Sequence, residues 1–227
     1  MHWNEHTYDI YSKEYYDWIQ EHLYSAVVAD ILDMLGWMDQ VMSPEIHPLY
    51  TGASIVGRAA TMLAVETYLV PEREYDMQLE LLDSVRPGEV VVCAMVGKRS
   101  AAMWGELIST HCKAHGVRGA VIGGQSRDIR GITALQFPVF GTGLVPADSK
   151  GRYNVVETRT KIQVGGVIVN DGDLLVADAD GCVVVPRTIE EEVICKASEK
   201  VSGENKVREI LAKGVSIRKV FEEYGIL

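Results

Sequence analysis

Three residues near the middle of the chain carry side chains that can act together on a small anion and a metal ion. Glu106 is separated by twenty residues from the adjacent pair Arg127 and Asp128. Carboxylates are hard oxygen ligands of the kind that Mg²⁺ prefers, and a guanidinium is a permanent cation that binds anionic oxygens. An adjacent arginine and aspartate can also be an ordinary ion pair on a solvated turn. What separates the two interpretations is whether Glu106 lies close to the pair.

The elements around these residues predict that it does. An apolar run over Ala120 to Ile122, bounded by glycines, predicts a short buried strand that opens at Gly123-Gly124 into a loop carrying the Arg-Asp pair. A helix of about three turns from Glu106 towards His115 precedes that strand. The start of the helix and the end of the strand then meet at one rim of a sheet.

The start of that helix is also a candidate site for a substrate carboxylate. The first amide groups of a helix have no partner within the helix and lie at the positive end of its dipole. The backbone N–H groups near Glu106, Leu107 and Ile108, which follow Gly105, can therefore hold an anion. The preceding loop, residues 97–103, adds Gly, Lys, Arg and Ser as further candidate contacts.

Two histidines on the same helix have a spacing that can bind metal. His111 and His115 lie four residues apart, and histidines at this spacing can share a zinc ion. The glutamate that accompanies them in zinc proteases is missing here. We therefore interpret them as ordinary histidines on the helix face.

The pattern of Glu106, Arg127 and Asp128 resembles the signature of a known family. The 4-hydroxy-4-methyl-2-oxoglutarate aldolases, which are class II pyruvate aldolases, and the proteins that resemble the regulator of ribonuclease E activity A carry an acidic residue, twenty residues, then Arg-Asp. The resemblance extends from about residue 30 to residue 208. It implies an α/β fold in which central β-strands are flanked by helices, an αββα-type sandwich. It also implies a homotrimer or a homohexamer.

Chemistry and resemblance together suggest a role for each residue. Asp128 would bind Mg²⁺ or Mn²⁺ directly, while Glu106 and, as the resemblance implies, Glu204 of a neighbouring subunit would hold metal-bound water. Arg127 would bind the keto or enolate oxygen of the substrate, and a metal-bound water would act as the base. The choice of Glu204 is open, because Glu199 and Glu209 lie nearby. Glu204 can also be an ordinary helical partner of Arg208.

These roles predict a divalent-metal-dependent lyase that cleaves a 4-hydroxy-2-oxo acid to pyruvate. Decarboxylation of oxaloacetate passes through the same enolate, so one site can catalyse both reactions. Two alternatives remain: a non-catalytic binding protein like the ribonuclease regulators, and another lyase or isomerase that acts on a sugar acid. Glu106 replaces the aspartate usual in the aldolases, and Gly123-Gly124 stands where they often have Asp-Gly. These departures leave the identity of the substrate open.

Composition sets the limits within which this function must fit. A chain of 227 residues with 47% hydrophobic content can bury one core. We divide it into an N-terminal helical segment (1–40), an α/β core (41–187) and C-terminal helices (188–227), which we expect to pack on a neighbouring subunit. The formal charge of −10 argues against general binding to nucleic acid or to an anionic membrane. The partner we expect is a small 2-oxo acid.

The cysteines and the apolar runs indicate a cytoplasmic protein. The four cysteines are widely spaced and form no C-x-x-C motif, which is typical of reduced, buried thiols. No apolar run approaches the length needed to span a bilayer. For the core, the sequence predicts one or two strands over residues 52–66 with a turn near Gly57, and a strand over residues 161–169. It predicts helices over residues 188–213 and 215–224.

Overall fold

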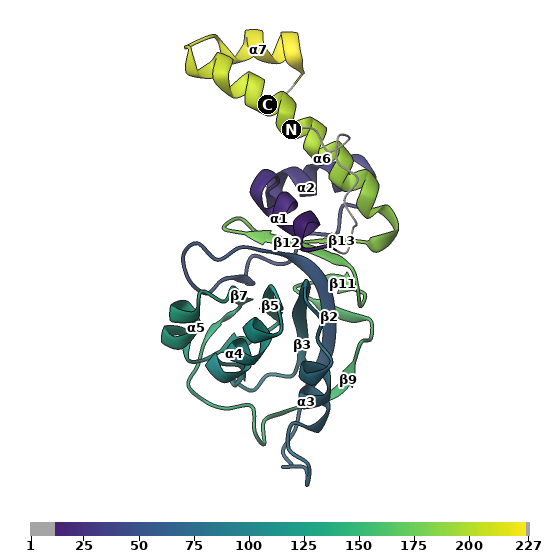
Figure 1. The fold of residues 1–227 in the computed structure, drawn as a ribbon, viewed down its shortest axis with the longest axis vertical. Coiled ribbons are helices and arrows are strands. Elements are labelled where there is room, and N and C mark those ends of the chain that lie inside the picture. The colour runs from purple at the N-terminus through teal and green to yellow at the C-terminus, as the bar shows by residue number, and fades with distance from the viewer. Residues whose placement is uncertain (1–11, 226–227) are drawn as a thin grey trace.

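The long strand β2 (Ile55–Glu66) is the centre of the fold, because three other strands pair with it. In the computed structural model, which describes residues 12–225, β3 (Glu89–Val96) runs parallel to β2 along one edge. β12 (Leu174–Asp178) and β9 (Tyr153–Thr158) share the other edge, both antiparallel. Within these residues the sheet has eight strands and is completed by β5 (Gly119–Ile122), β7 (Val139–Gly141), β1 (His47–Pro48) and β13 (Gly181–Val185) (Figure 1).

The turn predicted near Gly57 does not occur, and β2 continues through that residue. A Cβ atom at position 57 would lie 2.6 Å from the carbonyl oxygen of Gly88. The glycine therefore allows two backbones to approach closely and does not mark a turn. For residues 161–169 the prediction of a single strand is wrong. These residues form a hairpin of β10 (Ile162–Val164) and β11 (Val167–Val169). Two glycines with positive φ, Gly165 and Gly166, turn the chain there.

Apolar clusters hold layers of helices on this sheet. α3 (Asp76–Asp83), α4 (Glu106–Ala114) and α5 (Ile129–Leu135) cover one face (Figure 1) and bury Leu81 and Cys112 against it. The hairpin of β10 and β11 packs on the other face. The predicted α/β fold, with central strands flanked by helices, is confirmed.

The terminal helices form a third layer. α1 (Lys13–His22), α2 (Ser25–Met34) and α6 (Glu190–Ala212) bury apolar side chains against β12 and β13. After a break at Gly214, whose φ is +80°, α7 (Ile217–Tyr224) follows. The two predicted C-terminal helices are thus confirmed. Figure 1 shows the C-terminal part of α6 and α7 extending away from the sheet.

The N-terminal helical segment predicted from residue 1 is described only in part. Residues 1–11 lie outside the described residues, whereas α1 and α2 fall within the segment. No helix in the described part of the chain combines the length and the apolar character needed to cross a membrane.

A buried ion pair ties α6 to β2. The side chains of Arg58 and Glu190 are 7% and 3% exposed, and Nη2 of Arg58 donates to Oε1 of Glu190 at 2.7 Å. The hydroxyl of Tyr15 on α1 donates to the same oxygen at 2.7 Å. Burial, followed by the charge of Glu190, raises the pKa of Tyr15 well above its usual range, so the phenol remains a donor. Three elements that are distant in the sequence therefore share one polar network.

Replacing Glu190 with alanine is expected to lower the free energy of unfolding by about 3–5 kcal/mol, because it removes the carboxylate that accepts from the buried Arg58 guanidinium. Urea unfolding monitored by circular dichroism measures the change. Glu192→Ala is the matched control, since the Glu192 side chain is 53% exposed and its ion pair within residues 12–225 is with the exposed Lys196 at 3.7 Å. A loss below about 1 kcal/mol for Glu190→Ala would contradict the importance of the network.

Candidate functional site

A small parallel sheet brings the predicted residues together. β4 (Ala102–Trp104) pairs with β6 (Gln125–Ser126), with Trp104 beside Ser126, and β6 pairs in turn with β8 (Gly143–Leu144). The backbone N–H of Arg127 donates to the carbonyl oxygen of Trp104 at 2.9 Å. The residues that follow β4 and β6 therefore leave the sheet at the same edge. Sequence reasoning predicted a loop after Gly124 and missed β6, which is only two residues long.

Asp128 lies directly against the start of α4. It adopts the left-handed conformation, with φ 59° and ψ 33°, which aspartate tolerates better than most residues. Its Oδ2 accepts a hydrogen bond from the N–H of Glu106 at 3.3 Å and lies 3.6 Å from Nε of Arg127. A Cβ atom at Gly105 would lie 2.7 Å from the same oxygen. The glycine thus provides the space that the carboxylate occupies.

Arg127 is held by a second acid that sequence reasoning did not select. Its Nη2 lies 3.2 Å from Oδ2 of Asp148, which belongs to the loop after β8. Oδ1 of Asp148 accepts from the Tyr75 hydroxyl at 3.3 Å and from the N–H of Lys150 at 3.2 Å. The only sequence signal was an acidic residue in a polar loop after Pro146, and nothing in that pattern indicated contact with Arg127.

The pKa of Asp148 is lowered below its ordinary value. Burial alone would raise it, but the N–H of Lys150 and the Arg127 guanidinium favour the charged form more strongly. A group with a depressed pKa contributes stability above the pKa of the unfolded chain and loses it only as the pH falls through the folded pKa. The Arg127–Asp148 pair is therefore charged on both sides at neutral and mildly acidic pH.

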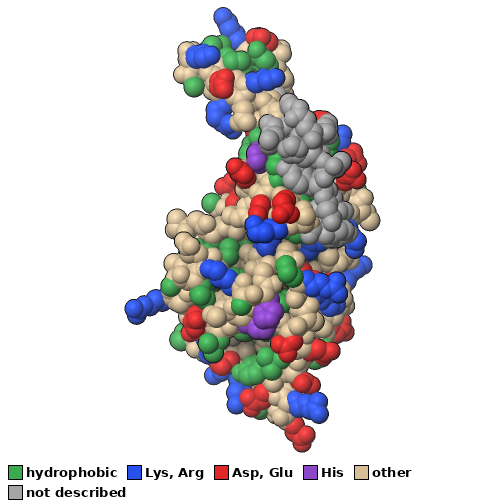
Figure 2. Space-filling view, viewed as in Figure 1, with side chains coloured by type: hydrophobic (Ala, Val, Ile, Leu, Met, Phe, Trp, Pro, Cys, Tyr) green, Lys and Arg blue, Asp and Glu red, His purple; other side chains and the backbone are tan. Residues whose placement is uncertain are grey.

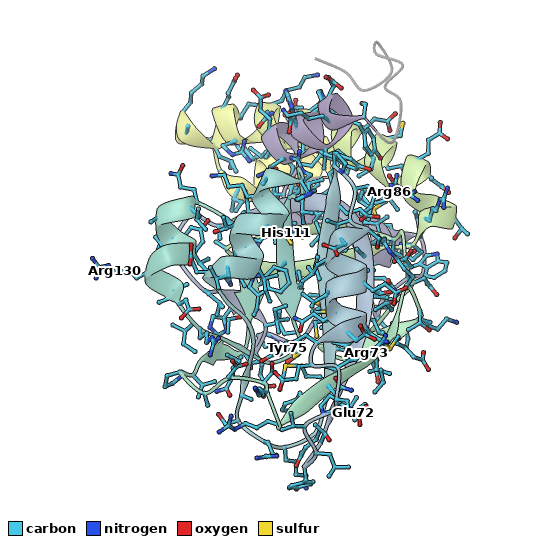
Figure 3. All side chains as sticks on the ribbon, turned by 60° about the horizontal axis from the view of Figure 1, so that its bottom comes forward. Glu72, Arg73, Tyr75, Arg86, His111 and Arg130 are labelled. Atoms are coloured by element: carbon cyan, nitrogen blue, oxygen red, sulfur yellow. The ribbon has the colours of Figure 1, made fainter. Side chains whose placement is uncertain are left out.

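These residues open on a cavity of ≈ 330 Å³. It lies between α3, the start of α4 and the loop after β8. Figure 3 shows Tyr75 near the middle of the molecule, whereas Arg130, two residues after Asp128, points away from it. The residues that line the cavity are Tyr75, Gln78, Leu79, Leu82, Ala102, Met103, Trp104, Gly105, Leu107, Ile108, Arg127, Asp128, Asp148 and Ser149. The predicted substrate contacts Gly105, Leu107, Ile108 and Arg127 are thus all in its wall.

Glu106 joins the site through its backbone more than through its side chain. Its carboxylate accepts from the Thr110 hydroxyl at 3.1 Å and is not part of the cavity lining. A Cβ atom at Gly131 would lie 2.4 Å from Cγ of Glu106, so the side chain rests against the first turn of α5. The carboxylate therefore points towards α5, and only the backbone N–H of Glu106 contacts Asp128. Its predicted role in holding water around a metal stays a prediction.

Glu204 lies on α6, away from this cavity within the chain. It accepts a hydrogen bond from the Tyr24 hydroxyl and lies 3.9 Å from Nζ of Lys200. Burial and this bond raise the pKa of Tyr24 to about 12. The helical pairing with Arg208, considered as the alternative from the sequence, is wrong, because Arg208 donates instead to Asn205. A role for Glu204 in a neighbouring subunit's site stays a prediction.

Two other candidate features have local partners. The N–H groups of Lys98 and Arg99 donate to the carboxylate of Glu66, so the loop before β4 binds an anion supplied by the protein itself. The rings of His111 and His115 stack with centroids 4.2 Å apart, and each has a nitrogen close to a backbone carbonyl oxygen. Over residues 12–225, no group of three or more His, Cys, Asp and Glu side chains is arranged to hold a metal ion.

The donor set at Asp128 fits a hard divalent cation that keeps most of its water. The Asp128 side chain is 49% exposed, and only its Oδ2 is engaged by neighbouring groups among the described residues. Its Oδ1 is available at the cavity, and carboxylate oxygen is the ligand that Mg²⁺ or Mn²⁺ selects. Mg²⁺ is often bound through one or two carboxylates with several waters retained, so one direct ligand is adequate.

Basic and acidic side chains are interspersed over the face of the molecule shown in Figure 2, and no extended basic patch gathers there. Charge at the cavity is instead concentrated in single residues. Arg127, Asp128 and Asp148 supply one positive and two negative charges to its lining. Such a site is suited to a small anion accompanied by a cation.

The sequence of this chain is similar to those of several known proteins. A protein of Halalkalibacterium halodurans that carries the provisional name 4-hydroxy-4-methyl-2-oxoglutarate aldolase is 32% identical over 86% of this chain and 89% of its own. The protein DlpA of Legionella pneumophila is 28% identical over 88% of this chain, which spans 32% of the length of DlpA.

A solved structure shows the same fold. RraAS2 of Streptomyces coelicolor, described as an unusual member of the RNase ES inhibitor RraA protein family, superposes with a TM-score of 0.76 and 26% identity, covering 87% of this chain and 98% of that one. The model of the RraA-like family, described as Aldolase/RraA, matches residues 25–184, which include α4, β6 and the Arg127-Asp128 pair. The chain belongs to the RraA-like (Aldolase/RraA) family.

Proposed function

We propose that this protein is a divalent-metal-dependent lyase that cleaves a 4-hydroxy-2-oxo acid to pyruvate and a second carbonyl compound. The observation that carries the proposal is the meeting of Arg127, Asp128 and the first amides of α4 at one cavity wall. A carboxylate, a guanidinium and residues of the first turn of α4 line the same cavity. The provisional aldolase name of the relative in Halalkalibacterium halodurans agrees with this reaction.

The residues of the chain would bind and orient the substrate. The N–H groups of Leu107 and Ile108 lie in the first turn of α4 and would hold the substrate carboxylate. Arg127 would place its guanidinium on the keto oxygen, where negative charge develops as the bond between C3 and C4 breaks. Asp148 would keep that guanidinium in position, because its Oδ2 lies 3.2 Å from Nη2 of Arg127. Oxaloacetate would bind in the same way.

Mg²⁺ or Mn²⁺ held by Asp128 would supply Lewis-acid polarisation of the keto oxygen. The carboxylate of Glu106, turned from its contact with Thr110, would orient water beside the cation. In the cleavage step the C4 hydroxyl gives up its proton and becomes the carbonyl group of the second product. The electron pair of the broken C3–C4 bond passes into the enolate of pyruvate, and protonation of C3 completes the methyl group.

A coupled assay of pyruvate release tests the proposal. Hydroxy-oxo acids and oxaloacetate are supplied to the parent protein with Mg²⁺ and, separately, with a chelator. We expect release that requires the cation and is lost in Arg127→Ala and Asp128→Ala. Failure of the parent to release pyruvate from any of these acids would reject the lyase function. Turnover of a sugar acid without pyruvate release would instead support the lyase or isomerase alternative.

Asp148→Asn tests the positioning of Arg127 and should lower kcat about 10- to 100-fold, in the range seen for groups that orient a catalytic side chain. KM should change less, since the first amides of α4 remain to bind the carboxylate. Steady-state kinetics at pH 7 measure both constants. Because the amide still accepts hydrogen bonds from Tyr75 and Lys150, the loop should keep its shape. An unchanged kcat would show that Arg127 needs no such support.

We also propose that the active unit is a homotrimer or a homohexamer in which α6 and α7 of one subunit pack on the next. The extension of these helices away from the sheet (Figure 1) supports this arrangement. Glu204, on α6, would then hold water at the neighbouring site. The Tyr24 and Lys200 contacts that it makes within its own chain would have to be exchanged for this role.

A non-catalytic role as a regulator of a ribonuclease is the second candidate. It is favoured by the likeness to RraAS2, whose description names an RNase inhibitor family. The pyruvate assay separates the two functions. A protein that binds a ribonuclease but releases no pyruvate with Mg²⁺ would support the regulator.

A further inference from the structure

The outer part of the cavity is apolar, which affects the kind of substituent that a substrate can place there. Leu79 on α3 and Leu107 on α4 line the cavity although their side chains are 53% and 80% exposed. Leu82 and Ile108 lie in the same wall. Apolar side chains are visible at the surface in the region of α3 and α4 (Figure 2). A substrate bound at Arg127 would therefore extend its far end along leucine and isoleucine side chains.

The polar groups of the cavity are already engaged. Among its described lining residues, Arg127 is the one basic side chain, and it contacts Asp128 and Asp148. The hydroxyl groups of Tyr75 and Ser149 both donate to Asp148, and the amide of Gln78 donates to the carbonyl oxygen of Met103 at 3.4 Å. Among the described residues, the outer wall therefore supplies no cationic side chain for a second carboxylate.

The charges of the cavity lining also disfavour a second carboxylate on the substrate. One guanidinium and two carboxylates leave the cavity with a single net negative charge. A divalent cation and a substrate with one carboxylate bring the site to neutrality. A dicarboxylate would place a second negative charge against an apolar wall that offers it no cationic partner.

We infer that the preferred substrates are 4-hydroxy-2-oxo acids with an apolar, uncharged substituent on C4, and that Leu79 and Leu107 determine this preference. The inference rests on the proposed lyase function. It departs from the dicarboxylic substrate in the provisional name of the relative in Halalkalibacterium halodurans. The reaction is unchanged: the C3–C4 bond breaks, the C4 hydroxyl proton is released, and the products are pyruvate and an apolar aldehyde.

Two substrates of nearly equal size test the inference. 4-Hydroxy-5-methyl-2-oxohexanoate carries an isopropyl group where 4-hydroxy-2-oxoglutarate carries its second carboxylate. We expect kcat/KM for pyruvate release with Mg²⁺ to be at least about tenfold higher for the isopropyl compound, the range that apolar pockets give for small differences in a side chain. An equal or higher value for the dicarboxylate would overturn the inference while leaving the lyase function intact.

Binding of analogues that cannot be cleaved separates the two proposals. 5-Methyl-2-oxohexanoate and 2-oxoglutarate lack the 4-hydroxyl group, and calorimetric titration in the presence of Mg²⁺ measures their affinities. Tighter binding of the apolar analogue supports the inference even where no substrate is cleaved. Tighter binding of 2-oxoglutarate overturns it.

A charge placed in the wall should reverse the preference. Leu79→Arg adds a cation to the outer cavity and should shift the ratio of the two kcat/KM values, or of the two affinities, at least about tenfold towards the dicarboxylate. Glu80→Arg is the matched control, because Glu80 is an exposed neighbour on α3 outside the cavity lining. An unchanged ratio in Leu79→Arg, or an equal shift in Glu80→Arg, would contradict a role for this wall in specificity.

Discussion

Asp128→Asn is expected to reduce metal-dependent pyruvate release by about a thousandfold, which corresponds to about 4 kcal/mol of lost transition-state stabilisation. Asparagine is among the few residues that adopt the left-handed conformation readily, so it can keep the φ of 59° observed at position 128. Its amide also retains an oxygen for the N–H of Glu106. What it loses is the negative charge that would hold the cation.

The comparison for this variant is Asp180→Asn, which makes the same chemical change at an exposed position in the turn before β13. Coupled kinetics over a range of Mg²⁺ concentrations should show no saturation by metal in Asp128→Asn and parent-like saturation in Asp180→Asn. If Asp128→Asn retained both its rate and its dependence on Mg²⁺, the cation would have to lie elsewhere.

Arg127→Ala should lower kcat about 10²- to 10³-fold, the usual effect of removing a group that stabilises developing negative charge. Arg127→Lys should recover only part of this loss. A lysine keeps the charge but cannot contact Asp148 and a keto oxygen with one planar fork of donors. Single-turnover measurements with saturating substrate report the chemical step directly.

Arg130→Ala is the control for Arg127, since Arg130 lies three residues further along and points away from the molecule (Figure 3). It removes the same charge from the chain and should leave kcat unchanged. An equal loss in Arg130→Ala would mean that general electrostatics, and not contact at the cavity, explains the effect. A kcat in Arg127→Ala close to that of the parent would remove Arg127 from the mechanism.

The inner part of the site was accessible from the sequence because local rules determine it. Gly105 and Glu106 begin α4, and the apolar run before Gly123 forms β5, as periodicity and glycine placement predicted. The parallel pairing of β4 and β6 then brings Glu106 beside Arg127 and Asp128. Two-residue strands such as β6 carry no periodic signal, so the element that fixes this approach could not be predicted.

Sequence patterns could not predict contacts between segments that are distant in the chain. Asp148 reaches Arg127 from a loop after β8, and its role depends on how residues 145–153 fold back over the sheet. The orientation of the Glu106 side chain towards Thr110 and Gly131 is likewise a result of packing between α4 and α5. Neither the period of apolar residues nor the spacing of charges contains this information.

Glycines were the residues most easily misread. Gly57 predicted a turn but lies within β2, near its start, whereas Gly165 and Gly166 make a turn inside what was predicted to be one strand. In the first case the missing side chain allows close contact with Gly88, and in the second it allows positive φ. A single sequence does not distinguish these two uses of glycine.

The central claim is that Asp128, beside the start of α4, holds one divalent cation per chain. Titration with Mn²⁺, followed by electron paramagnetic resonance of the free ion, tests it most directly and requires no substrate. The account predicts one Mn²⁺ bound per chain in the parent protein, displaced by Mg²⁺, and no such binding in Asp128→Asn. Undiminished binding in Asp128→Asn, or none in the parent, would contradict it.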